Sequence, residues 1–181
     1  MKRSVAAIIG LVLAALTVVA APASATTPYC GIRWGSLAKS VPGNSPDALV
    51  DVRAGQHACY DRVVLDVAGP ALGYSVQYVA QVRDQGRGEV VPVRGGARLE
   101  VVAFVPDYDI TTGIPAYAPA DPANLVSVTG FRTLRQVAFA GSFEGYTSIG
   151  VGVRARLPFR AFVLNGPGSR SRIVIDIAHR W

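Results

Sequence analysis

The sequence predicts an all-β protein: an antiparallel β-sandwich or small barrel of about eight short strands, with one long Pro-rich loop and little helix. Three observations predict this class. Apolar residues recur with a period of two in several segments, which is the period of a half-buried strand. Glycine and proline clusters separate these segments as turns. One longer segment, residues 106–129, contains four prolines and interrupts the alternation.

The start of the chain is typical of a secretory signal peptide. Lys2 and Arg3 precede an apolar run over residues 5–21, and the small residues Ala23-Ser24-Ala25 follow. An uncleaved membrane anchor is the less favoured alternative, because the run is short for a bilayer span. We therefore expect residues 1–25 to be removed and residues 26–181 to be secreted to the cell envelope, with no membrane span after cleavage.

The two cysteines, Cys30 and Cys59, predict one disulfide, because cysteine pairs of exported proteins become oxidised outside the cytoplasm. The bond would tie an N-terminal segment, residues 26–51, onto a β domain formed by residues 52–181. A metal site or a redox pair is the alternative, and His57 lies nearby as a candidate metal ligand. Two cysteines and one histidine do not complete a zinc site, however. We expect no metal and no cofactor.

Eight segments show the alternation or composition of strands. In the first of them, Val63, Leu65 and Val67 share one face. The predicted strands cover residues 61–68, 74–82, 89–93, 98–105, 134–139, 146–154, 159–164 and 172–178. The only helix expected is a single turn from Pro46, with Ser45 as its N-cap.

Residues 62–68 recur, position by position in type, as residues 172–178. In an antiparallel pairing with Val64 opposite Val174, opposite charges would face each other at Arg62–Asp176 and at Asp66–Arg172. Each such pair contributes roughly 0.2–1 kcal/mol, whereas a parallel in-register pairing would place like charges together. We expect these first and last strands to be neighbours. The alternative is pseudo-symmetry between two halves of the domain.

Residues 106–129 form an unusually long connection for a compact domain, and loops of this length are functional or mobile. Asp107 and Asp109 suggest a calcium site as one alternative. A solvated loop is the favoured interpretation, because the ligand spacing of a calcium loop does not continue beyond them.

The charge of the chain is basic and uneven. Removal of Lys2 and Arg3 would lower the net charge from +6 to +4. Residues 131–181 carry eight arginines against Glu144 and Asp176. This excess would attract an anionic polymer outside the cell, although the codon bias of a GC-rich genome also explains many arginines. Export makes nucleic acid a poor candidate partner.

Catalytic motifs are not apparent in the sequence. It has no nucleophile elbow, no H-E-x-x-H helix and no Gly-rich phosphate loop. His57 and His179 are the only histidines. Asp66 and Asp176 each follow an arginine at a four-residue spacing, which suits ion pairing better than glycoside cleavage. We therefore expect that the protein is not an enzyme.

Several segments together resemble the AMIN-like domain proteins, which are small exported proteins of high-GC Gram-positive bacteria. The resemblance extends over about residues 52–179. The segments that carry it are residues 60–66, 73–79, 96–101, 137–145, 148–153, 158–162 and 172–176. It implies a sandwich of two similar sheets, like the amidase N-terminal domain, and a role in binding peptidoglycan.

We expect a non-enzymatic module of the cell envelope that binds peptidoglycan or an associated anionic wall polymer. Arginine forks suit carboxylates and phosphates, and aromatic faces suit sugar rings. The residues expected to contact the polymer are Phe131, Arg132, Arg135, Phe143, Tyr146 and Arg160. One alternative is a secreted protein–protein interaction module that binds an envelope protein through the 106–129 loop. A wall hydrolase that uses His57 or His179 is the third interpretation.

Overall fold

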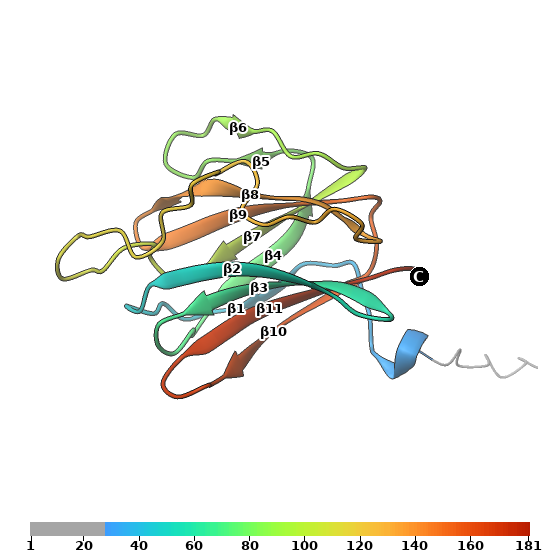
Figure 1. Ribbon diagram of the computed structural model, residues 1–181, viewed down its shortest axis with the longest axis horizontal. Coiled ribbons are helices and arrows are strands. Elements are labelled where there is room, and N and C mark those ends of the chain that lie inside the picture. Colours follow the sequence, from blue (N-terminus) through green and yellow to red (C-terminus); the bar gives the residue numbers. More distant parts are fainter. Residues whose placement is uncertain (1–27) are drawn as a thin grey trace, which may run out of the picture.

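The computed structural model describes residues 28–181, so the predicted signal peptide lies outside the described residues. Two antiparallel sheets pack face to face as a β-sandwich, and a small two-stranded sheet lies beside one of them (Figure 1). Helical structure in residues 28–181 is confined to one 3-10 turn, η1 (Tyr29–Gly31). The predicted all-β class is confirmed, and the sandwich is the alternative that forms.

The first sheet has four strands in the order β10-β11-β3-β2. Its strands are β2 (Leu49–Gln56), β3 (Tyr60–Val67), β10 (Phe159–Asn165) and β11 (Ser171–Ala178). The repeated segments lie in β3 and β11, which pair antiparallel with Val64 opposite Val174. The predicted neighbours and their register are therefore confirmed.

Only one of the two predicted charge pairs on this ladder forms as an ion pair. Arg62 Nε lies 2.6 Å from Asp176 Oδ1. Asp66 lies opposite Arg172 in register, but its carboxylate binds Arg53 of β2, with Nε and Oδ2 2.5 Å apart. Because β2 is not among the predicted strands, the competing arginine was not anticipated.

The second sheet has five strands in the order β1-β4-β7-β9-β8. Its strands are β1 (Lys39–Val41), β4 (Tyr74–Val79), β7 (Ala97–Ala103), β8 (Leu134–Phe143) and β9 (Tyr146–Val153). β5 (Val82–Arg83) and β6 (Val90–Val91) form the small sheet. The structure thus has eleven strands, because β1 and β2 were not predicted and the strand predicted at 74–82 divides into β4 and β5.

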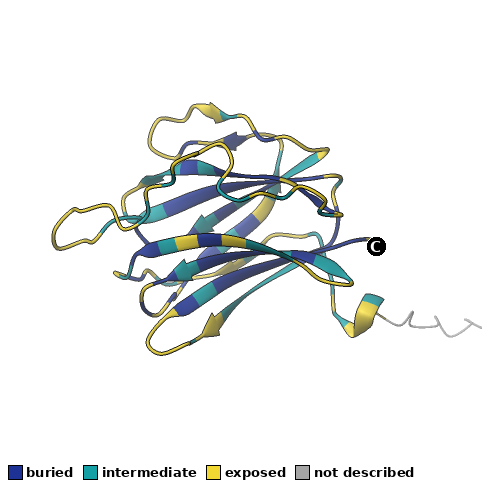
Figure 2. Cartoon of the chain, viewed as in Figure 1, coloured by how far each residue is buried: buried dark blue, intermediate teal, exposed yellow. Residues whose placement is uncertain are grey.

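The core lies between the two sheets, and the alternation of apolar residues decides which side chains enter it. Val63, Leu65 and Val67 of β3 point inward, as do Leu99 and Val101 of β7. Figure 2 shows the strands alternating between buried and more accessible residues, with exposed residues concentrated in the connections. The period of two in the sequence therefore predicted the core faces correctly.

The N-terminal segment closes one open side of the sandwich. Gly35 pairs with Phe159 at the edge of β10, while β1 pairs with β4 in the other sheet. Cys30 and Cys59 form the predicted disulfide, which fixes the segment to the β2–β3 turn. These contacts cover strand edges that would otherwise invite pairing with another chain.

The long connection between β7 and β8 closes the opposite side. Its Leu125 amide donates to the Val137 carbonyl, and the Phe139 amide donates to the Pro122 carbonyl, so the loop runs along the edge of β8. Gln56 of β2 donates to the Gly130 carbonyl, which links the loop to the other sheet. Five apolar residues of the loop pack against the core: Tyr117, Leu125, Val126, Val128 and Phe131.

The burial of Tyr117 makes this closure sensitive to high pH. Burial raises the pKa of Tyr117 to about 12, and the negative charge of Asp51 adds to the effect. Because the unfolded chain releases this proton first, stability should fall as the pH rises from about 10 towards 12. We expect Tyr117→Phe to flatten that decline in urea unfolding across the alkaline range. Equal slopes for the two proteins would contradict this prediction.

The helical turn predicted from Pro46 does not form. Ser45 Oγ accepts a hydrogen bond from the Asp47 amide at 3.2 Å, so the serine stabilises a bend. The Leu49 amide then donates to the Pro106 carbonyl as β2 begins. Strand β2 begins at Leu49, so only two residues separate Pro46 from the strand and a helical turn does not fit between them. Across residues 28–181, no helix is both long and apolar enough to span a membrane.

Candidate functional site

The six residues predicted to contact a wall polymer lie in three separate places. Phe131, Arg132 and Arg135 come together where the long connection enters β8. Phe143 ends β8 and Tyr146 begins β9, so both lie at the opposite end of this hairpin, roughly 25 Å away at about 3.3 Å per residue. Arg160 is on β10, in the other sheet. The structure does not bring the six residues into one contact surface.

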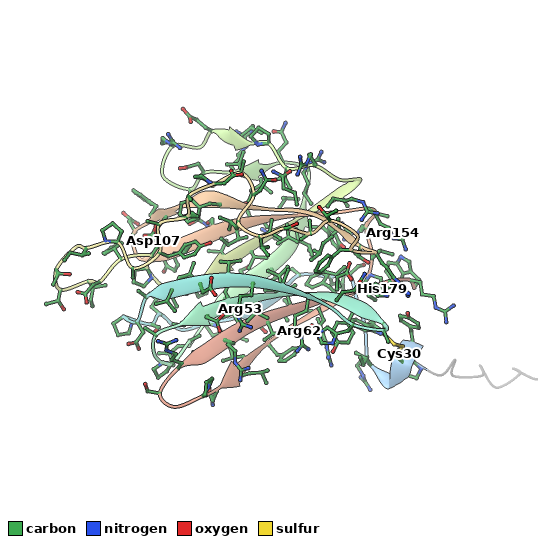
Figure 3. The ribbon with its side chains drawn as sticks, in the orientation of Figure 1. Cys30, Arg53, Arg62, Asp107, Arg154 and His179 are labelled. Atoms are coloured by element: carbon green, nitrogen blue, oxygen red, sulfur yellow. A yellow bond between two sulfur atoms is a disulfide. The ribbon has the colours of Figure 1, made fainter. Side chains whose placement is uncertain are left out.

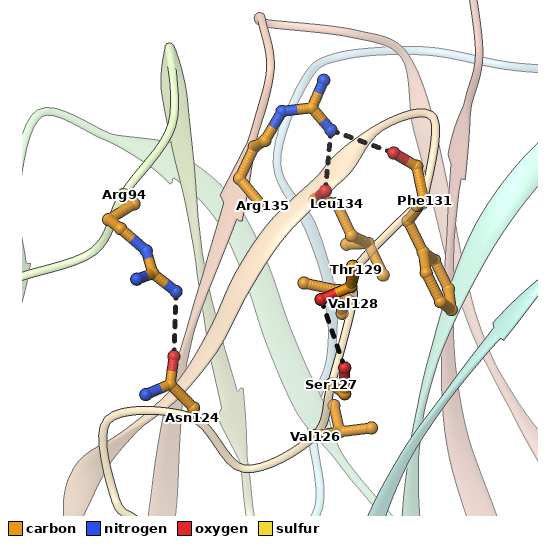
Figure 4. Close-up of a pocket in the computed structure, with 10 residues that line it drawn as sticks. Arg94, Asn124, Val126, Ser127, Val128, Thr129, Phe131, Leu134 and Arg135 are labelled. Atoms are coloured by element: carbon orange, nitrogen blue, oxygen red, sulfur yellow. Dashed lines mark hydrogen bonds between the residues drawn. The ribbon is translucent and has the colours of Figure 1, made fainter.

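The first place is an open groove of about 600 Å³ between the long connection and β8. Figure 4 shows Arg94 at the left, Arg135 at the upper centre, and Val126, Val128 and Phe131 to the right, all of them lining the groove. Leu134 completes the apolar floor. None of the residues that line the groove is acidic.

The guanidinium groups of the groove are already engaged by the protein. Arg135 donates from Nη1 to the carbonyls of Phe131 and Leu134, at 3.1 and 2.8 Å (Figure 4). Arg94 donates from Nη2 to Asn124 at 2.9 Å. These bonds hold both side chains in place and leave other N–H donors of each fork available, since guanidinium has five.

The outer face of the four-stranded sheet carries a second arginine cluster. Asp176 is fully buried, and two arginines enclose its carboxylate. Arg62 binds it with two hydrogen bonds, 2.6 and 2.9 Å long, and Arg160 Nη2 lies 2.7 Å from Oδ2. The hydrogen bond to Asp176 raises the pKa of Arg62. Figure 3 shows Arg62 on this sheet, and one carboxylate there orders two guanidinium groups.

Aromatic rings surround these guanidinium groups. The Arg160 guanidinium lies 5.0 Å from the ring centre of Phe162, 5.5 Å from that of Tyr60 and 5.7 Å from that of Trp34. Trp34 also packs against Tyr60, with ring centres 5.9 Å apart. Such cation–π contacts contribute roughly 0.5–1 kcal/mol each at exposed sites. The cluster is therefore both charged and aromatic.

Trp34 also lines a pocket of about 450 Å³ formed where the two described ends of the chain meet. Its other lining residues are Pro28, Tyr29, Ile32, Arg33, Pro158, Arg180 and Trp181. Arg180 lies over the Tyr29 ring, 4.7 Å from its centre. Trp181 has 70% of its surface exposed. Trp34 therefore connects this pocket to the arginine cluster on the sheet.

We call the combined region the arginine–aromatic surface. Its members come from both ends of the described chain and from the outer face of one sheet: Tyr29, Arg33, Trp34, Tyr60, Arg62, Arg160, Phe162, Arg180 and Trp181. Two of its four arginines, Arg62 and Arg160, share the carboxylate of Asp176, which lies beneath them. The surface is thus positively charged and rich in flat rings.

The sequence model of the AMIN-like domain matches residues 47–179. The chain belongs to the AMIN-like domain family. This match confirms the resemblance in the sequence, and the family is associated with peptidoglycan-related amidase modules. No curated protein and no solved structure has significant similarity to the chain.

The matched range of the AMIN-like domain contains only part of the arginine–aromatic surface. Tyr60, Arg62, Arg160 and Phe162 lie inside it, whereas the pocket residues at 29–34 and 180–181 lie outside. Of the residues predicted to contact a polymer, only Arg160 belongs to this surface, and the residues of the terminal pocket were not among those predicted. One signal was available: the two tryptophans of the chain lie near the two ends of the predicted mature protein.

The residues considered for catalysis have structural partners in this AMIN-like domain. His57 stacks on Tyr60, with ring centres 4.5 Å apart. His179 is buried and lies 3.0 Å from Asp61 through Nε2. Asp66 and Asp176 each bind arginine. Within residues 28–181, no group of three His, Cys, Asp or Glu side chains is arranged to hold a metal ion.

Asp109 is one of the two carboxylates that suggest calcium as the less favoured alternative for the long connection. Asp109 Oδ1 accepts hydrogen bonds from the amides of Thr111 and Thr112, at 2.8 and 2.9 Å. These amides lower the pKa of Asp109. The carboxylate therefore stabilises a turn of its own loop.

Proposed function

We propose that this AMIN-like domain is a non-enzymatic module of the cell envelope that binds peptidoglycan or an associated anionic wall polymer through the arginine–aromatic surface. Membership of the family supports a role at the cell wall and outside the cytoplasm. The Cys30–Cys59 disulfide supports the same location, because disulfides persist in oxidising compartments.

The observation that carries the proposal is the position of Trp34. Its ring lines the terminal pocket and also lies 5.7 Å from the Arg160 guanidinium. A polymer of sugar rings with pendant carboxylates or phosphates needs both kinds of contact at neighbouring positions. Indole faces pack on sugar rings, and arginine forks bind carboxylate or phosphate in a bidentate manner. The surface provides both along one continuous path.

The fixed positions of the Arg62 and Arg160 side chains support specific binding of a ligand over non-specific electrostatic attraction. Asp176 fixes Arg62 and Arg160 through short hydrogen bonds, so little side-chain entropy remains to be lost when a ligand arrives. Both groups remain partly exposed, with 21% and 32% of their side-chain surface accessible. They are therefore held in place and still within reach of a ligand.

A pull-down with purified wall sacculi at low ionic strength tests the proposal. We expect the protein to sediment with the sacculi, and Trp34→Ala combined with Trp181→Ala to weaken binding at least about tenfold, because buried aromatic anchors dominate such interfaces. Phe143→Ala is the matched control, since Phe143 is an exposed aromatic residue (47%) at the other end of the sandwich.

Two outcomes would contradict this proposal. The first is that the unaltered protein stays in the supernatant at low ionic strength. The second is that Phe143→Ala weakens binding as much as the tryptophan variant does. Release of muropeptides by the protein, with loss of that activity in His57→Ala or His179→Ala, would instead identify a wall hydrolase.

One observation favours a second function, protein–protein interaction through the 106–129 loop. Ile110 and Ile114 are exposed within this loop, with 56% and 64% of their surface accessible. This function predicts that replacing both isoleucines by serine abolishes partner binding. The same replacement should leave sacculus binding unchanged, so the two functions can be separated.

A further inference from the structure

Residues 107–116 form an ordered hairpin that extends beyond the sheets, which we call the finger. The Asp109 amide donates to the Ile114 carbonyl, and the amides of Ala116 and Tyr117 donate to the Asp107 carbonyl. In Figure 1 the finger is the yellow loop that projects from the sandwich, and Figure 3 labels Asp107 at its base. Its shape is therefore fixed by its own hydrogen bonds before any partner binds.

The tip of the finger is apolar although it faces solvent. Ile110 and Ile114 flank the turn, and more than half of the surface of each is exposed. Two large exposed aliphatic residues on one ordered turn are typical of an interaction site rather than of scattered surface residues.

The charge around this tip is opposite to that of most of the protein. No lysine or arginine occurs between Arg98 and Arg132. Asp107 and Asp109 belong to the finger, and Asp121 follows it in the same connection. A partner for the finger should therefore offer an apolar recess bordered by positive charge.

The groove of Figure 4 has these properties. Its floor is formed by Val126, Val128, Phe131 and Leu134, and Arg94 and Arg135 border it. It lacks acidic lining residues, and its volume of about 600 Å³ accommodates two isoleucine side chains and the turn between them.

The finger cannot reach the groove of its own chain. The residues that connect the two are fixed to β8, since the Phe139 amide donates to the Pro122 carbonyl and Gln136 Nε2 donates to the Ala123 carbonyl. Folding the finger back would break these bonds. The groove of a second copy has the same chemistry without this restraint.

We propose that the finger of one copy docks into the groove of a second copy of this chain. The contact joins two different surfaces. After the first contact one copy still has a free finger and the other a free groove, so further copies can add head to tail and form rings or filaments. This inference does not depend on wall binding.

Sedimentation velocity of the purified protein over micromolar to millimolar concentrations tests the proposal. We expect the mean mass to rise with concentration beyond that of a dimer. Ile110→Ser with Ile114→Ser should weaken association at least about tenfold. Val128→Asp should do the same from the groove side, and Arg94→Glu is a second groove variant that leaves the apolar floor intact.

Mixing the variants gives the decisive measurement. The finger variant keeps an intact groove, and a groove variant keeps an intact finger, so each should be monomeric alone while an equal mixture forms heterodimers. Leu37→Ser with Leu72→Ser is the matched control, because these residues are 79% and 51% exposed on other parts of the surface. This control should associate like the unaltered protein.

Three results would overturn the proposal. They are a monomer at every concentration, association that the finger and groove variants do not change, and a mixture of variants that stays monomeric. Restored dimers in the mixture cannot arise from finger-to-finger or groove-to-groove contacts, because one partner of each such contact would be altered.

Discussion

Replacing both cysteines, Cys30→Ser with Cys59→Ser, should lower the free energy of unfolding by about 3–4 kcal/mol, because the disulfide closes a loop with a sequence separation of 29. Wall binding should fall by more than this loss of stability explains. Cys30 adjoins Tyr29, and the bond holds the segment that carries Arg33 and Trp34. Urea unfolding and sacculus pull-down at a temperature where the variant is folded measure the two effects separately.

A matched control for this prediction lies in the core. Leu99 is fully buried in β7, and Leu99→Ala should cost about 2–5 kcal/mol. This variant leaves the N-terminal segment in place and should still bind sacculi when it is folded. If the cysteine variant binds as well as Leu99→Ala does, the disulfide has no role in shaping the surface.

The four-stranded sheet shows what the sequence can determine. The repeat at 62–68 and 172–178 combines alternating apolar residues with opposite charges at matched positions, so a slip of one residue would place the apolar set outside and separate the charges. The observed register follows from these two constraints. The alternation of apolar residues and the matched charges can both be read from these two segments, so one sequence is enough to predict the register.

Strand β2 shows why other parts could not be predicted. Its pairing with β3 shifts between Leu49 and Asp51, and this bulge breaks the period of two that reveals a strand. Only Leu49 and Val52 of β2 are buried. β1 has three residues, too few for any period to appear.

The arginine–aromatic surface contains only one of the six residues predicted to contact a polymer, Arg160, which lies beside the Phe162 ring. The part of the surface that lines the terminal pocket comes from residues 29–34 and 180–181, which are far apart in sequence. The disulfide and the Gly35–Phe159 pairing bring them together, and spacing along the chain does not reveal such closure.

Asp61 gives the second prediction with a large effect. It is fully buried at the start of β3, and its Oδ2 accepts hydrogen bonds from the amides of Thr133 and Leu134, at 2.5 and 3.0 Å. Its Oδ1 lies 3.0 Å from His179 Nε2. Because a carboxylate only accepts hydrogen bonds, Nε2 of His179 carries the proton in this pair.

Asp61→Ala leaves two buried amides and one histidine N–H without their acceptor. Each such loss costs about 1–3 kcal/mol, so for the three groups we expect the free energy of unfolding to fall by roughly 3–9 kcal/mol. Asp61→Asn keeps one oxygen for the amides and should cost less. A double-mutant cycle with His179→Ala, measured by urea unfolding, isolates the contribution of the Asp61–His179 contact.

The same carboxylate should also affect binding. The backbone of His179 is fixed on both sides, since its amide donates to the Cys59 carbonyl and its carbonyl accepts from Arg154. Arg180 and Trp181 follow directly and line the terminal pocket. Asp61→Ala should therefore weaken sacculus binding even where the variant is fully folded, and Leu99→Ala should not. If the two variants bind equally well, the Asp61–His179 pair stabilises the sandwich without positioning the pocket.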